Sequence, residues 1–168
     1  MQKSIWFIIG IVLTLLIGVI FVLNGNQKQA EKDEMEQLSV STHDFQKVLA
    51  YENDFMGNAS NMNNLFNNLP LSNYKGAVEL DSESFIFTVN YDTVGDDQTV
   101  IYNATAAFVL IKNLEVMEMR FTNRSYVITR ENVEKWFGSN LEKLTDPARF
   151  KEKVQKPLMN DDGKGWLN

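Results

Sequence analysis

The strongest constraint on this chain is an uninterrupted apolar run near its N-terminus, IWFIIGIVLTLLIGVIFVL, from Ile5 to Leu23. These nineteen residues carry no charge. A helix that rises roughly 1.5 Å per residue would extend them over about 28 Å, close to the hydrocarbon thickness of a bilayer. A cleaved secretory signal has a shorter apolar core and a small-x-small cleavage site, and the following VLNGNQKQ offers no such site. We therefore expect residues 1–23 to be an uncleaved signal anchor that forms one transmembrane helix.

The residues on either side of this run bear on its orientation. Lys3 precedes it, and Lys28 and Lys32 follow it, so the basic residues are nearly balanced. The short head leaves no room for a folded domain on its side. We expect a single-pass protein of the cell membrane, held by Ile5–Leu23, with its N-terminus inside and its domain outside. The formal net charge of the chain is −6, so this domain is not expected to be drawn to nucleic acid or to anionic headgroups.

The remaining chain divides by composition. Residues 24–40 are polar and without a repeated apolar face, which predicts a solvated stalk. Residues 41–158 form the expected extracytoplasmic domain, and residues 159–168 a tail. The chain has no cysteine and one histidine, His43, which excludes a thiolate metal site and a multi-histidine relay. The absence of cysteine also suits a Gram-positive cell surface. We expect His43 to be exposed in the first turn of a helix that begins after Ser41.

The stretch MGNASNMNNLFNNLPL, residues 56–71, is rich in asparagine. Met62, Leu65, Phe66 and Leu69 recur at helical spacing, and Pro70 ends the pattern. The stretch is therefore predicted to be an amphipathic helix capped by Ser60. Its outer faces carry amides, and uncharged amides suit sugars or peptides. Three of them are candidate contacts for a ligand or partner: Asn61, Asn64 and Asn68.

Beyond Pro70 the apolar period changes from helical to alternating. Strands are predicted at 77–80 and 85–91, then a long apolar helix over about 98–112, then strands near 114–121, with a bulge around 116–117, and 126–129. Helices capped by Thr129 and by Asp146 or Thr145 follow, and Gly138 ends the first of them. The expected fold is α+β, a small, mainly antiparallel four-stranded sheet covered by helices and preceded by the transmembrane helix.

Few residues suggest chemistry. Arg130 and Glu131 stand where a strand passes into a helix, a position at which a guanidinium can meet a carboxylate. An internal salt bridge is the alternative to a binding role for this pair. DTVGDDQT only faintly resembles a calcium loop. No phosphate loop and no nucleophile elbow occur, so we expect no catalytic residue, no metal and no cofactor.

Several motifs in order resemble an uncharacterised Bacillota family of exported domains. They include NLPL at residues 68–71, NATAAFVLIKNL at 103–114 and TREN at 129–132, which runs on into VEKWFG at 133–138. The similarity covers roughly residues 45–140. It implies a domain behind a single membrane anchor, joined in some relatives to membrane receptors, and a sensory or interaction role without known catalytic residues. Asp54 and Phe55 depart from the family pattern, which puts any shared contact there in doubt.

The sequence thus favours a non-enzymatic binding, interaction or sensory module at a bacterial cell surface, with a membrane receptor or envelope protein as partner. Two alternatives stay open. A structural subunit of a membrane complex would expose a contiguous apolar patch. A carboxylate-dependent hydrolase of envelope polymer would place two acids about 5–9 Å apart across a cleft.

Overall fold

The computed structural model describes residues 38–161 and 166–167. The expected span Ile5–Leu23 and most of the stalk lie outside these residues. Within the described part, no helix has both the length and the apolar character needed to cross a bilayer. The described residues belong to one compact unit.

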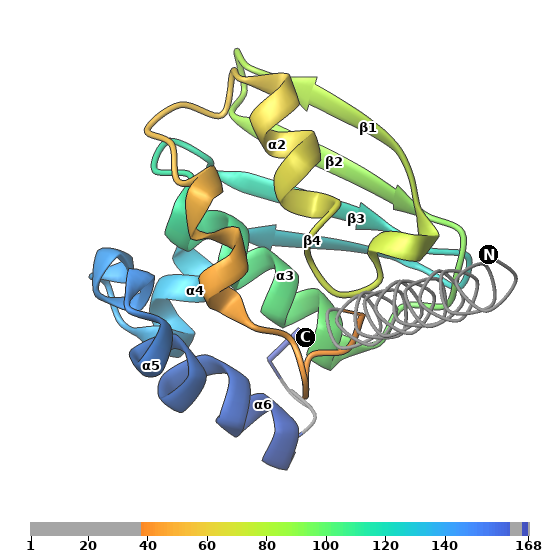
Figure 1. The fold of residues 1–168 in the computed structure, drawn as a ribbon. Coiled ribbons are helices and arrows are strands. Elements are labelled where there is room, and N and C mark those ends of the chain that lie inside the picture. The colour runs from red at the N-terminus through yellow and green to blue at the C-terminus, as the bar shows by residue number, and fades with distance from the viewer. Residues whose placement is uncertain (1–37, 162–165, 168) are drawn as a thin grey trace, which may run out of the picture. The chain divides into compact units, whose positions relative to one another are not determined.

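Four strands form one mixed sheet (Figure 1). They are β1 (Lys75–Asp81), β2 (Ile86–Tyr91), β3 (Val116–Arg120) and β4 (Ser125–Thr129), in the spatial order β1-β2-β3-β4. The pairs β1–β2 and β3–β4 are antiparallel, and β2–β3 is parallel. The parallel pair requires a crossover, which α3 (Asp97–Leu110) provides. The α+β class and the four strands are confirmed, but the sheet has a parallel centre that local sequence patterns did not indicate.

The expected bulge at 116–117 is wrong. β3 pairs without interruption with both neighbours, from Val116 to Arg120. The irregularity lies instead in β1, between Lys75 and Val78. There the edge strand has a partner on one side only, so an extra residue disturbs a single ladder.

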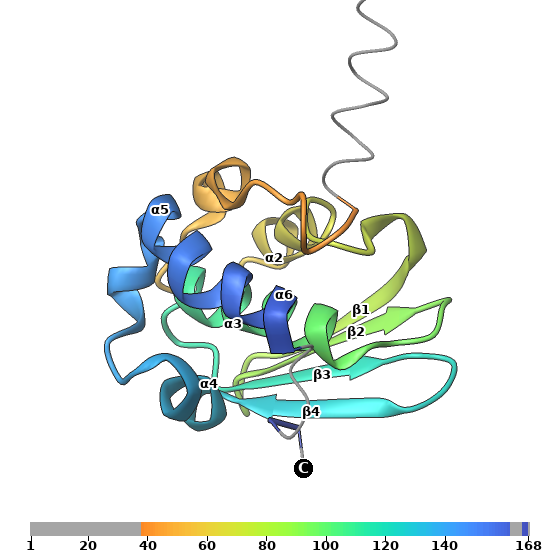
Figure 2. The ribbon, with the colours of Figure 1, turned by 90° about the horizontal axis from the view of Figure 1, so that it is seen from below.

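The helix α3 forms the centre of the core. All its residues from Thr99 to Leu110 are buried, which agrees with a sequence that is apolar around its whole circumference. Asp96 caps its N-terminus by accepting a hydrogen bond from the amide of Thr99. Figure 2 shows α3, α2 and the α5–α6 run on one side of the sheet. The other side has no helix across it in the described part, and we call it the open face.

Two helical segments precede the sheet. The first is a 3-10 helix, η1 (Phe45–Tyr51), whose cap is Asp44. The second is α2 (Ala59–Phe66), whose cap is Asn58 and not the expected Ser60. Met62, Leu65 and Phe66 are buried as predicted. A short 3-10 turn, η2 (Ser72–Tyr74), then leads into β1.

The chain after the sheet is helical. α4 (Arg130–Phe137) begins with the predicted cap Thr129, which forms a capping box with Asn132, and it ends at Gly138, whose φ is 98°. The 3-10 turn η3 (Leu141–Thr145) follows. Asp146 then caps α5 (Pro147–Phe150), which continues through the π segment η4 (Lys151–Gln155) into α6 (Lys156–Asp161). Trp166 packs on Trp136 and Phe137 with ring centroids 5.7 and 5.4 Å apart.

Candidate functional site

The open face of the sheet carries an ordered polar cluster at its centre. In each strand alternate side chains point to opposite faces. Phe87, Met117 and Met119 are buried against the helices, so their neighbours Thr88, Glu118 and Arg120 point to the open face. The register sets Glu79 opposite Thr88, and Thr88 opposite Glu118. Three neighbouring strands therefore contribute to one row of side chains.

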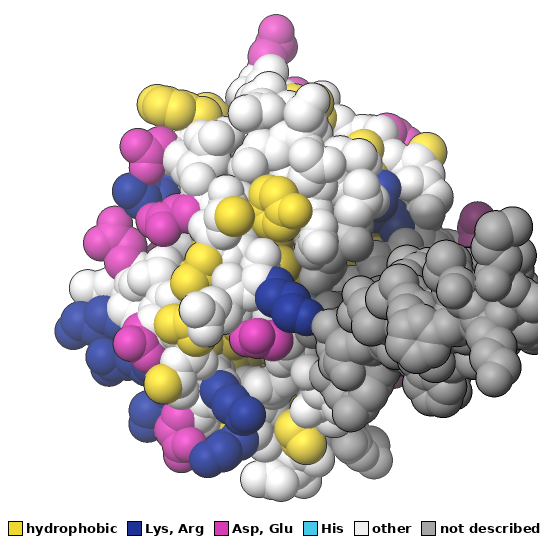
Figure 3. Space-filling view, in the orientation of Figure 1, with side chains coloured by type: hydrophobic (Ala, Val, Ile, Leu, Met, Phe, Trp, Pro, Cys, Tyr) yellow, Lys and Arg dark blue, Asp and Glu magenta, His cyan; other side chains and the backbone are white. Residues whose placement is uncertain are grey.

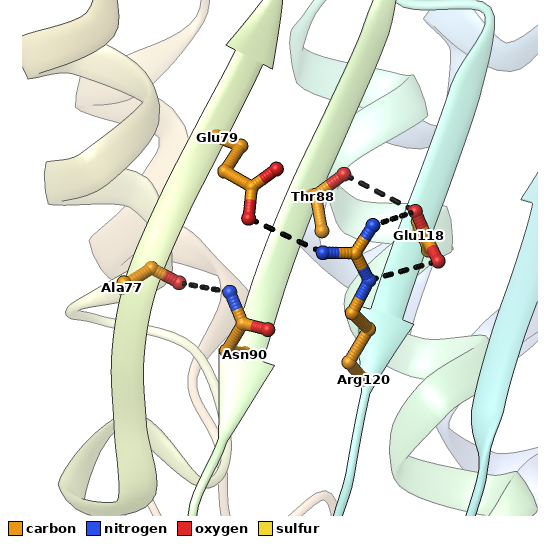
Figure 4. Close-up of polar contacts among 6 residues, drawn as sticks. All are labelled: Ala77, Glu79, Thr88, Asn90, Glu118 and Arg120. Carbon is orange, nitrogen blue, oxygen red and sulfur yellow. Dashed lines mark hydrogen bonds and ion pairs between the residues drawn. The ribbon is translucent and has the colours of Figure 1, made fainter.

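Arg120 connects this row (Figure 4). Its Nε and Nη2 donate to the two carboxylate oxygens of Glu118, at 2.9 and 2.8 Å. Its Nη1 donates to Oε1 of Glu79 at 3.2 Å. Thr88 Oγ1 donates to Glu118 at 3.4 Å, and Asn90 Nδ2 donates to the carbonyl of Ala77 at 2.9 Å. We call Glu79, Thr88, Asn90, Glu118 and Arg120 the sheet cluster.

The ion pair of Glu118 with Arg120 favours the charged form of both side chains. The hydrogen bonds from Arg120 lower the pKa of Glu118. The carboxylates of Glu118 and Glu79 in turn raise the pKa of Arg120. The side chains of Glu79, Arg120 and Glu118 are 63, 40 and 26% exposed. Two carboxylates share one guanidinium, so the cluster carries a net negative charge. Its acceptor oxygens are held in place by these hydrogen bonds, and groups ordered in this way lose less entropy if they bind another molecule.

Apolar side chains flank the sheet cluster on the same face. The register places Ile86 beside Val116, and Val127 beside Glu118. Val127 is 63% exposed. A charged centre beside accessible aliphatic groups has the mixed composition of a protein contact surface.

The three candidate asparagines do not form one free amide surface. Asn61 Nδ2 donates to the carbonyl of Tyr51 at 2.7 Å, and Asn68 Nδ2 donates to the hydroxyl of Tyr51 and the carbonyl of Asn64. Asn61 and Asn68 therefore connect α2 and the residues just after it to Tyr51 of η1, and Asn68 also closes a local contact with Asn64. Asn64 is exposed. The amides were expected to face outward as a set, but two of them face the neighbouring segment.

Arg130 and Glu131 likewise do not form one site, because their side chains have different partners. The Arg130 side chain is 18% exposed, and its Nε and Nη2 donate to the carbonyls of Leu114 and Ile111 at 2.9 and 2.7 Å. Both carbonyls lie in the turn after α3, and that of Ile111 also accepts from the amide of Leu114. Burial lowers the pKa of Arg130, and Glu115, 3.8 Å away, opposes that effect. Glu131 is exposed and pairs with Lys135 one turn along α4.

His43 is buried, which corrects the expectation of an exposed side chain. Its Nδ1 lies 2.7 Å from the hydroxyl of Tyr102, and its Nε2 lies 2.8 Å from the carbonyl of Asn68. Burial lowers its pKa to about 4. The ring is thus a hydrogen-bonded part of the core between η1, α2 and α3.

The acidic turn before α3 has structural contacts. Asp96 caps α3, and Asp97 pairs with Arg124. Within the described residues, no group of three or more His, Cys, Asp or Glu side chains could hold a metal ion. Two acids of the faint calcium-loop pattern, Asp96 and Asp97, thus serve as a helix cap and an ion-pair partner.

The sheet cluster was not among the sequence candidates. The alternation of Glu118 and Arg120 along a predicted strand was visible, because it lies in one short segment. Their partners Glu79 and Thr88 lie on other strands, and only the register of the sheet brings them together.

Comparison with known families gives one match. The family model described as a domain of unknown function, DUF4825, matches residues 48–131, which is half of the chain. The chain belongs to this family. The DUF4825 match runs from the middle of η1 to the first turn of α4 and so contains all four strands. No curated protein and no solved structure matches the chain.

Proposed function

We propose that this DUF4825 protein is a non-enzymatic interaction module on the outer side of a bacterial cell membrane. In this proposal Ile5–Leu23 anchors the chain, and the open face of the sheet contacts the partner. The observation that carries the proposal is the sheet cluster, a set of ionised and hydrogen-bonded groups held in place on a face without a covering helix among the described residues.

The charge of this face defines the partner. Glu79 and Glu118 share Arg120, and Asp81 belongs to the same face by strand alternation. The face is therefore complementary to a surface that presents Lys or Arg. We propose an envelope protein or membrane receptor with such a basic patch, which would also bury Val127 and Ile86. Charge complementarity of this kind orients the encounter and selects the partner.

The two alternatives have less support. A hydrolase of this type needs an acid whose pKa is raised, whereas Arg120 lowers the pKa of Glu118. A structural subunit would bury a contiguous apolar patch. The exposed large apolar side chains of the described part lie on separate segments: Phe55, Tyr74, Phe85, Val94, Val127 and Met159.

Site-specific photocrosslinking in cells of the native host tests the proposal. A photoreactive amino acid replaces Val127 on the open face or, as control, Met159 in α6, another exposed apolar residue. We expect one defined protein adduct from position 127 and none from position 159. The double change Glu79→Lys and Glu118→Lys should remove the adduct, because it makes the face basic.

The matched control reverses the same number of charges elsewhere, by Glu131→Lys and Glu152→Lys. Both of these glutamates are exposed and pair with a lysine on their own helical segment. The proposal is wrong if the adduct survives reversal at Glu79 and Glu118. It is also wrong if both pairs of changes abolish the adduct equally.

A further inference from the structure

A second surface of the domain has the opposite charge. A cavity of about 280 Å³ lies where α4 ends and the C-terminal helices begin, and it is lined by Ser139, Asn140, Lys143, Arg149 and Lys153 among others. We call it the basic pocket. Figure 3 shows Lys and Arg side chains gathered over α5 and the segment that follows, at the lower left.

Three separate elements position the cations of the basic pocket. Gly138, with φ at 98°, turns the chain out of α4 and leads Ser139 and Asn140 to the rim. Lys143 comes from η3, Arg149 from α5 and Lys153 from η4. Arg149 and Lys153 are four residues apart in one helical run and so share a side of it. The convergence therefore comes from the fold and not from one run of basic sequence.

The basic pocket differs from most other cationic positions of the described part, although Lys47, Lys75 and Lys151 also form no ion pair there. Lys112, Arg120, Arg124, Lys135 and Lys156 each pair with a carboxylate. Lys143, Arg149 and Lys153 form no ion pair there, and no acidic residue lines the pocket. Three like charges around a small cavity repel one another. An anion in the cavity would relieve that repulsion.

We propose that the basic pocket binds a phosphate group. Phosphate carries more charge than a carboxylate and has more acceptor oxygens, so it can contact three cations at once. The guanidinium of Arg149 suits two phosphate oxygens, and each ammonium group adds a compact charge. The side chains of Ser139 and Asn140 supply neutral donors at the rim. Ionic screening over about 8–10 Å limits the repulsion from distant acidic residues. Of the acids close to these cations in the sequence, Glu152 pairs with Lys156 and Asp146 caps α5.

The experiment uses the full chain in dodecyl maltoside, a detergent without phosphate, and inorganic phosphate as the probe. NMR titration at constant ionic strength, with chloride as reference, should give saturable shifts confined to the backbone amides of residues 137–153. The triple change Lys143→Gln, Arg149→Gln and Lys153→Gln should weaken phosphate binding by about tenfold or more, because each removes a charge-assisted contact.

The matched control removes three other exposed cations of the same region, by Lys135→Gln, Lys151→Gln and Lys156→Gln. It should keep the phosphate response of the unmodified chain. The proposal is overturned if chloride produces the same shifts, or if both triple variants lose the response equally. Spectra that are unchanged away from the substituted residues and their immediate neighbours show that each variant is folded.

Two further probes identify the source of the phosphate group. Soluble glycerol phosphate represents a free or polymer-bound phosphate, and nanodiscs that contain phosphatidylglycerol represent a lipid headgroup. If glycerol phosphate saturates the basic pocket and the nanodiscs have no effect, the natural ligand is a phosphate of the envelope or of a solute. Shifts of the same amides in the nanodiscs, without a soluble probe, assign a lipid. This site is independent of the sheet cluster, so the charge reversals at Glu79 and Glu118 should leave it unchanged.

Discussion

His43 shows how a single residue depends on distant parts of the chain. Its two hydrogen-bond partners, Tyr102 and Asn68, lie 59 and 25 positions away. The carbonyl of Asn68 only accepts, so Nε2 carries the proton and Nδ1 accepts from Tyr102. A sequence window around His43 contains neither partner. That is why local reasoning placed this side chain in solvent.

The lowered pKa of His43 predicts a pH dependence of stability. The pKa falls from 6.5 to about 4 on folding, so between these values the unfolded chain binds more protons than the folded one. The neutral His43 therefore adds its full share to the free energy of unfolding above pH 6.5. About 3 kcal/mol of that free energy is lost as the pH falls toward 4. His43→Gln keeps a donor and an acceptor without this titration.

Urea unfolding of residues 36–168 at several pH values measures the effect. The free energy of unfolding of the variant should fall less steeply between pH 6.5 and pH 4 than that of the unmodified domain. Carboxylates titrate in both proteins, so only the difference between the two curves reports on His43. Parallel curves would show that the imidazole does not titrate in this range.

Two buried tyrosines offer a matched comparison. Tyr102→Phe removes the donor to His43 and should lower the free energy of unfolding by about 1–3 kcal/mol, because a buried acceptor loses its partner. Tyr91→Phe removes a buried hydroxyl that lies near Asn103 but meets the geometry of no hydrogen bond within the described residues, and it should have a smaller effect. Chemical denaturation of both variants checks the prediction. Equal losses would contradict it.

At the level of elements, the sequence predicted helix ends well and predicted the pairing of strands less well. Thr129, Asp146 and Gly138 were expected at helix ends and are found there, because caps depend on a few neighbouring residues. The order of helices and strands is also confirmed. The parallel contact of β2 with β3 was not foreseen, since neither strand carries a mark of its partner's direction. The sheet cluster was missed for the same reason.

The turn before α3 contains a tight contact that can be tested. A methyl group on Gly95 would lie 2.5 Å from the ring of Phe121, which stacks on Tyr91 with centroids 4.7 Å apart. Gly95→Ala should therefore cost about 1–3 kcal/mol of stability through overpacking. Gly57→Ala is the control, because nothing lies within 4 Å of its added methyl group.

Thermal unfolding followed by circular dichroism compares the two variants. The midpoint should fall for Gly95→Ala and should stay the same or rise slightly for Gly57→Ala. A fall of equal size in both would mean that backbone freedom, and not contact with Phe121, sets the effect.

For the whole molecule, the proposed anchor is the feature to test. Full-length chain should stay with the membrane after alkaline carbonate extraction, and a chain without residues 1–35 should not. Leu13→Arg places a charge near the middle of the apolar run. Such a charge makes membrane insertion less favourable by about 2.5–3.5 kcal/mol, so it should reduce membrane retention. Gln29→Arg, beyond the run, is the control.

Protease treatment of intact cells tests the orientation. Degradation of the domain in untreated cells supports an outward domain, and protection until lysis would contradict it. Mass spectrometry of the retained protein distinguishes an anchor from a cleaved signal, because cleavage would remove the Ile5–Leu23 run.

Gln155 joins the beginning of the described chain to its last helical run. Its side chain donates to the carbonyls of Val40 and His43 at 2.5 and 2.9 Å, and it is buried. The amide of Leu71, just ahead of β1, donates to the carbonyl of Leu38 in the same region. A pull on the chain ahead of residue 38 would therefore be shared between the C-terminal helical run and the approach to the sheet. If the chain is tethered at its N-terminus, both layers of the domain carry the tether.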